Sequence, residues 1–150
     1  MPVAAASVDE EGRNVAAFRR LIQEGFSRGE LSVVDEICAE EHVEHQDGLN
    51  PPGRQGVKQG IAFLHRLSPD ITVTVEDLAA QGDKVWARLR ARGTHSGEIL
   101  GNPTGRAFDI TVMDVCRFQD GQVVEHWGVP DRFAQMQQLG ILPGAGPARL

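Results

Sequence analysis

Two side chains near the end of the chain have the chemistry of a proton-transfer pair. Asp114 and His126 lie in two segments of alternating apolar and polar residues, separated by the turn sequence Asp120-Gly121. This pattern predicts two antiparallel strands joined by a hairpin. Burial raises the pKa of a carboxyl group and a neighbouring imidazolium lowers it, so such a pair could move a proton near neutral pH. The alternative is a buried pair that only satisfies its own hydrogen bonds.

The length of the hairpin loop decides whether the pair forms. A two-residue loop would set Asp114 opposite Trp127 and would mix apolar and polar residues on both faces. A three-residue loop, Gln119 to Gly121, with Gly121 left-handed in a bulge, would set Asp114 opposite His126. Because the second register gives a coherent inner face, we expect it, with the two Cβ atoms roughly 5 Å apart.

The segment His42-Val43-Glu44-His45 could suggest a metal site. Residues three apart on a strand point to opposite sides, so the two histidines cannot easily share one ion. We therefore expect no metal site there.

The elements that must position these groups are helices first and strands second. Helical spacing predicts a helix from the Ser7 cap to Gly29, a short one around 33–38, a third carrying 57–64 and a last one from Asp131 to Gly140. Alternation predicts a short extended piece over 42–46 and strands over 71–76, 85–92, 108–118 and 123–129. This order indicates an α+β fold, a curved antiparallel sheet wrapped around the N-terminal helices and enclosing a pocket. We expect one domain over 7–142 and loose termini at 1–6 and 143–150.

Several residues are candidates for the wall of that pocket. Phe26, Phe63 and Trp86 could line it, although large apolar side chains most often pack in the core. Val112 and Gly128 would face each other on the inner side in the three-residue register. His95 is a further candidate, with the alternative that it holds the loop from Ser96 to Gly105 in place.

Composition excludes several classes of protein. The 150 residues carry a formal net charge of −6, which disfavours nucleic-acid binding. No apolar run approaches the ~20 residues of a membrane span, and residues 1–8 lack the features of a secretory signal. We expect a cytoplasmic protein in which Cys38 and Cys116 are free and buried.

The outer face of the hairpin is apolar for a surface left in water. It carries Met113, Val115, Val123 and Trp127, with Arg117 and Glu125. A second copy of the chain covering this face would explain it, so we expect a homodimer, or a tetramer, formed through the outer sheet face.

Several short segments resemble the SnoaL-like polyketide cyclase family. They are Gly93-Thr94-His95-Ser96-Gly97-Glu98, Gly101-Asn102-Pro103-Thr104-Gly105, Arg117-Phe118-Gln119-Asp120-Gly121, Glu125-His126-Trp127, Pro130-Asp131 and Gln138-Leu139-Gly140. The likeness runs from about Asn14 to Leu142 and keeps the order of the segments. It implies the cone-shaped α+β barrel typified by nuclear transport factor 2, a deep pocket, a small-molecule substrate, and neither metal nor organic cofactor.

The resemblance also implies site residues, with departures. The family's acid/base aspartate corresponds to Gly128, its partner histidine to Asp114 and an asparagine to His45. We expect Asp114 to act as acid/base, with His126 and His45 assisting. The family's reaction is an intramolecular aldol ring closure, and relatives isomerise ketosteroids or open epoxides. We expect cyclisation or isomerisation of an apolar, oxygenated molecule; the alternatives are epoxide or ester hydrolysis, or binding of a hydrophobic molecule without catalysis.

Overall fold

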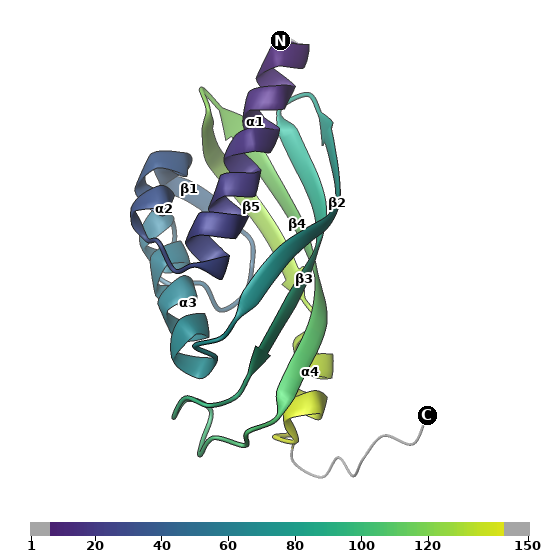
Figure 1. Ribbon diagram of the computed structural model, residues 1–150. Coiled ribbons are helices and arrows are strands. Elements are labelled where there is room, and N and C mark those ends of the chain that lie inside the picture. Colours follow the sequence, from purple (N-terminus) through teal and green to yellow (C-terminus); the bar gives the residue numbers. More distant parts are fainter. Residues whose placement is uncertain (1–6, 143–150) are drawn as a thin grey trace.

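The computed structural model describes residues 7–142, in which one bent sheet has the N-terminal helices on one side (Figure 1). The elements in chain order are α1 (Val8–Arg20), its π-helical continuation η1 (Leu21–Ser27), α2 (Ser32–Ile37), β1 (Cys38–Glu44), α3 (Arg54–Leu67), β2 (Thr72–Gln81), β3 (Lys84–Thr94), β4 (Ala107–Gln119), β5 (Gln122–Pro130) and α4 (Arg132–Leu139). The predicted α+β fold is confirmed. The termini predicted to be loose, 1–6 and 143–150, lie outside the described residues. Within 7–142, no helix has the length and apolar character needed to cross a membrane.

The sheet has the strand order β1-β5-β4-β3-β2. Strands β2 to β5 are antiparallel neighbours, whereas β1 lies parallel to β5 and pairs Glu44 with His126. The extended segment predicted over 42–46 therefore begins earlier, at Cys38, directly after α2. This parallel pairing of two segments 82 residues apart brings the first half of the chain to the hairpin.

The hairpin register differs from the predicted one. Asp114 pairs with Gly128, not with His126, and Val112 pairs with Pro130. The turn has two residues, Asp120 and Gly121, both with positive φ (51° and 79°), as in a type I′ turn. A bulge at Val124 then adds one residue to β5, because Phe118 pairs with Val123 while Arg117 pairs with Glu125.

The bulge explains why the even-numbered residues of both strands share the inner face although the loop is short. It restores the even-with-even pairing that the sequence analysis obtained from a longer loop. It also turns Val123 inward, where only 1% of its surface is exposed, so the prediction of Val123 on the outer face was wrong.

Helix caps and the core hold the helices against the concave face of the sheet. The Ser7 hydroxyl accepts the backbone N–H of Glu10, and the Asp131 carboxylate accepts that of Ala134, so both predicted caps form. The core includes Phe18, Ile22, Val34 and Ile61 from the helices and Val85, Leu89, Phe108 and Phe118 from the sheet. Cys38 and Cys116 are free and buried, as predicted.

Candidate functional site

A cavity of about 590 Å³ lies between the concave face of the sheet and the helices η1 and α3. Phe26, Phe63 and Val112, three of the predicted wall residues, line it. Its wall is mostly apolar, with polar side chains contributed by Gln46, Asp47, Asn50, Gln59, Asp114, His126, Arg132 and Gln135. A mostly apolar pocket with a few convergent polar groups is typical of a small-molecule site.

Asp114 and His126 meet at the wall of this cavity. The Nε2 of His126 lies 2.8 Å from Oδ1 of Asp114. Both residues are buried, with 8% of the surface of Asp114 and 9% of that of His126 exposed. They are diagonal neighbours in the sheet rather than a direct pair, a separation that side chains of this length span. Among the described residues Asp114 accepts this one side-chain hydrogen bond, so its Oδ2 is left to the cavity.

Glu44 and His42 extend the pair into a network. Oε1 of Glu44 lies 2.7 Å from the Nδ1 of His126 and accepts the backbone N–H of Gln46 at 2.8 Å. Its Oε2 lies 3.1 Å from Nε2 of His42. The side chain of Glu44 is 3% exposed, so the imidazole of His126 sits between two buried carboxylates.

This environment sets the charge of the two central groups. Burial alone would lower the pKa of His126, but the charge of Asp114 and the hydrogen bonds to Asp114 and Glu44 outweigh it and raise the pKa to about 10. Burial alone would raise the pKa of Glu44, but hydrogen bonds from His126 and His42 lower it to about 2. At neutral pH His126 is therefore an imidazolium that donates from both ring nitrogens.

Comparison with known proteins places the chain in a family. The model of the SnoaL-like polyketide cyclase domain matches residues 16–139. The chain belongs to this family. No curated protein matches the chain.

Solved structures agree with this assignment. IdmH of Streptomyces antibioticus, a candidate polyketide cyclase, is 37% identical, with a TM-score of 0.74 over 85% of this chain and 98% of IdmH. A candidate polyketide cyclase of Bacillus cereus ATCC 10987 is 28% identical, with a TM-score of 0.79 over 91% and 87%. AclR of Streptomyces galilaeus, a candidate hydroxylase, is 26% identical, with a TM-score of 0.78 over 91% and 86%.

Gly128 lies beside the network of this SnoaL-like chain, directly opposite Asp114. A Cβ built on Gly128 would overlap Oε1 of Gln46 and would come within 2.8 Å of Oδ1 of Asp114. This position, where the resemblance described in the sequence analysis implies the family's aspartate, is thus closed to any side chain as long as Gln46 keeps its place.

Three predicted site residues lie away from the cavity. His45 is on the outer face: its ring stacks on Trp127 with centroids 4.7 Å apart, and its Nε2 lies 2.9 Å from Oε1 of Glu125. Trp86 is 51% exposed, because it occupies the outward phase of β3. These two placements correct the sequence analysis, and both follow from strand alternation.

The third residue, His95, is fully buried but outside the cavity wall. Its Nε2 donates to the carbonyl of Ile99 at 2.7 Å, and its Nδ1 accepts the backbone N–H of Thr104 at 3.4 Å. It therefore holds the loop between β3 and β4, which was the alternative explanation for this residue.

The cluster of Asp114, Cys116 and His126 has ligand atoms within 4.8 Å of one another. Two of these groups hold protons that a metal would have to displace. Both nitrogens of His126 face carboxylates, and burial raises the pKa of the Cys116 thiol well above its usual value. The donor set is thus arranged to keep a proton and fits a metal ion poorly.

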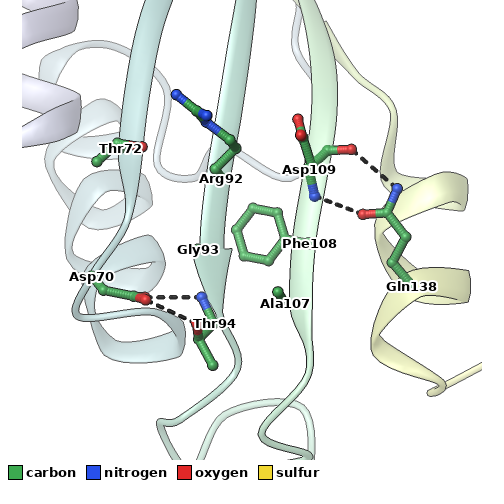
Figure 2. Close-up of a pocket in the computed structure, with 9 residues that line it drawn as sticks. All are labelled: Asp70, Thr72, Arg92, Gly93, Thr94, Ala107, Phe108, Asp109 and Gln138. Carbon is green, nitrogen blue, oxygen red and sulfur yellow. Dashed lines mark hydrogen bonds between the residues drawn. The ribbon is translucent and has the colours of Figure 1, made fainter.

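A second hollow lies on the outer face, over the ends of β2, β3 and β4, and Figure 2 shows its lining. Two of its polar side chains, those of Asp70 and Gln138, hold neighbouring segments together. The carboxylate of Asp70 accepts the backbone N–H and the hydroxyl of Thr94, both at 2.8 Å. The amide of Gln138 from α4 pairs with the backbone N–H and carbonyl of Asp109 at 2.7 and 3.0 Å. These hydrogen bonds join β3 to the residues before β2, and α4 to β4, whereas the buried carboxylate–imidazole pair lies at the inner cavity.

The sequence analysis missed Glu44 and Gln46 as site residues. The signal was present in the alternation of the segment that begins at His42. Because His42 and His45 point to opposite sides, as predicted, Glu44 and Gln46 share the side of His42. What the sequence did not show was that this side faces His126.

Proposed function

We propose that this chain is an acid/base enzyme that removes a proton from carbon next to a carbonyl group of an apolar, oxygenated small molecule and thereby closes a ring or isomerises the molecule. One observation carries the proposal: the carboxylate of Asp114 borders a mostly apolar cavity while the buried imidazolium of His126 binds its other oxygen. The likeness to candidate polyketide cyclases supports the reaction class.

Asp114 is the base in this scheme. Its Oδ2 takes the proton from carbon, and the electron pair of the C–H bond moves to the carbonyl oxygen as an enolate. In ring closure the enolate carbon then attacks a second carbonyl carbon of the same molecule, and the new alkoxide takes the proton back from Asp114. In isomerisation the proton returns to a different carbon. Protons and electrons balance within one substrate, so the scheme needs no organic cofactor or metal.

His126 is a positioning residue in this scheme. As an imidazolium between Glu44 and Asp114, it donates a hydrogen bond to Oδ1 of Asp114 and fixes the direction of the other carboxylate oxygen. Glu44 in turn fixes the ring of His126. A carboxylate in an apolar, water-poor site is a stronger base toward carbon than one in water.

A proton-exchange experiment tests the proposal without knowledge of the natural substrate. The probe is 2-tetralone in D₂O, whose protons next to the carbonyl are replaced by deuterium when a base removes them, as NMR shows. We expect Asp114→Asn to slow enzyme-dependent exchange by about 10²- to 10⁴-fold. The matched control is Asp47→Asn, which changes another carboxylate at the same cavity and should leave exchange near the wild-type rate. Equal exchange by wild type and Asp114→Asn would contradict the proposal.

Hydrolysis in the same cavity is the second candidate. Asp114 would then take a proton from water, which attacks an epoxide or ester carbon. The amides of Gln46, Gln59 and Gln135 line the cavity and could hold such a water. Turnover of a panel of ketones, esters and epoxides in H₂¹⁸O separates the two candidates, because only hydrolysis adds labelled oxygen. Recovery of a bound ligand unchanged, with no turnover or exchange, would indicate the non-catalytic alternative.

We also propose that a second copy of the chain covers an outer apolar patch, formed by Val43, Trp86, Met113, Val115, Trp127 and Val129. Trp86, Val115 and Trp127 form one row across three strands, and Met113 and Val129 are 53% and 70% exposed. Neighbouring charges on this face are already paired, as in Arg88 with Asp77 and Arg90 with Asp109, so an identical neutral surface can pack against it.

The oligomeric state tests this surface. In light scattering coupled to gel filtration, the wild type should have the mass of a dimer or tetramer, and Met113→Glu should shift it toward the monomer. Gln119→Glu, at the exposed end of the same strand, is the control and should leave the mass unchanged. A monomeric wild type would overturn the proposal.

A further inference from the structure

Gly128 is a glycine for reasons of space and not of backbone conformation. Its φ lies outside the left-handed range, so an alanine could adopt the same backbone. The obstacle is what its Cβ would meet: first Oε1 of Gln46, and then Oδ1 of Asp114 at 2.8 Å. The amide of Gln46 thus occupies the space that a side chain at position 128 would need.

Gln46 is held in that place from one end only. Its backbone N–H donates to Oε1 of Glu44 at 2.8 Å, which ties the start of the side chain to the carboxylate network. The amide itself lines the cavity, is half-buried, and has no hydrogen-bond partner among residues 7–142. A half-buried amide that lines a cavity beside a carboxylate, and that has no partner among these residues, is available to a ligand.

We infer that Gln46 donates the hydrogen bond that holds the reacting carbonyl oxygen of the substrate beside Asp114, and that Gly128 is required because it leaves room for this amide. The inference rests on the proposed function for the identity of the reacting oxygen. When Asp114 takes the proton from carbon, negative charge develops on that oxygen, and a fixed N–H donor next to it stabilises the enolate. Gln46 also sets the ligand class: a molecule with an enolisable carbonyl or an acidic hydroxyl on an apolar body.

A pair of fluorescent probes tests this inference apart from turnover. 2-Naphthol carries a hydroxyl that resembles the enol, and naphthalene is the same apolar body without it. We expect Gln46→Ala to weaken binding of 2-naphthol about tenfold, the size of one hydrogen bond in a partly desolvated site, and to leave naphthalene binding unchanged. Gln55→Ala, which removes an exposed amide of α3 outside the cavity lining, is the control and should change neither.

Gly128→Ala provides the second half of the test. The overlapping atom of Gln46 is the far end of a flexible side chain, so the variant should fold while displacing the amide. We expect it to weaken 2-naphthol binding in the wild-type background, and to do so clearly less in the Gln46→Ala background, where only the contact with Asp114 remains. A thermal unfolding curve for each variant verifies that it is folded.

Two results would overturn the inference. One is a Gln46→Ala variant that binds both probes as the wild type does. The other is strict additivity of Gln46→Ala and Gly128→Ala, which would mean that the two positions do not share one space. Failure of the proposed function has a different signature, because loss of deuterium exchange depends on Asp114, whereas the preference for 2-naphthol over naphthalene depends on Gln46.

Discussion

Two Glu-His dipeptides lie side by side on the parallel strands β1 and β5, and they have opposite surroundings. Glu44 pairs with His126, His45 follows directly after β1, and each glutamate reaches the histidine of the other dipeptide. Glu44 binds His126 at 2.7 Å on the inner face, and Glu125 binds His45 at 2.9 Å on the outer face. The residue types and the distances are nearly the same, and strand alternation alone sends one pair inward and the other outward.

Burial separates what the two pairs can do. The inner pair lies against a cavity and contacts a second carboxylate, Asp114, so the pKa of His126 rises to about 10. In the outer pair the side chain of His45 is 39% exposed, so solvent weakens its interaction with Glu125. A carboxylate and an imidazole within hydrogen-bond distance are therefore not a site in themselves; desolvation and access to a cavity make the difference.

Replacement of each histidine by alanine should give the largest difference in stability between the two pairs. His126→Ala leaves Glu44 and Asp114 buried without their shared partner, and we expect the free energy of unfolding to fall by about 3–5 kcal/mol. His45→Ala removes an exposed partner and should cause a much smaller loss. Urea denaturation at pH 6 measures both. Equal losses for the two variants would show that the inner network does not depend on its central cation.

The pH dependence of stability should come from the inner pair. The pKa of His126 is raised from its ordinary 6.5 to about 10, so its contribution is complete below pH 6.5 and is lost as the pH rises through 10. The pKa of Glu44 is lowered from 4.5 to about 2, so its contribution is complete above pH 4.5 and is lost as the pH falls through 2. We expect a stability plateau between these limits in urea titrations from pH 3 to 10. The double variant Glu44→Gln/His126→Gln should flatten the profile, and an unchanged profile would contradict this origin.

Replacement of one glutamate at a time by glutamine tests the same comparison through a smaller effect, the change in the pKa of His126. Glu44→Gln removes one of the two negative charges on His126 and should lower its pKa by about one to three units. Glu125→Gln, the outer counterpart, should leave the titration of His126 unchanged. NMR chemical shifts of the His126 ring against pH measure this directly. If Glu125→Gln moved the titration as far as Glu44→Gln does, the two faces would not be electrostatically separate.

Local patterns in the sequence predict most of this fold. Caps at Ser7 and Asp131, apolar spacing in the helices and alternation in β2 to β5 each act within a few residues, so they can be read directly. The contact of Asp114 with His126 was also within reach, because both sit in one hairpin. The register of the hairpin could not be predicted, since a short turn with a bulge and a longer loop give the same alternation of residues up to the turn.

The remainder of the site depends on contacts between distant segments. Nothing near Glu44 in sequence indicates that its strand lies parallel to β5, 82 residues further along. For the same reason the resemblance to the family led to His45 when the inward residues are Glu44 and Gln46. The surroundings of Gly128 could not be predicted either, because a glycine in a sequence does not indicate which neighbouring side chain fills the space beside it.

The bulge at Val124 determines which residue of the second dipeptide faces the cavity. Regular alternation from the inward Val123 would turn Glu125 inward and His126 outward, and the bulge reverses this order from Glu125 onward. A β5 strand of the same length without the bulge would therefore present Glu125 and Trp127 to the cavity and His126 to the outer face. The reactive interior thus depends on one local irregularity of the backbone, and a change that straightened this strand without removing a residue would replace it with an inert one.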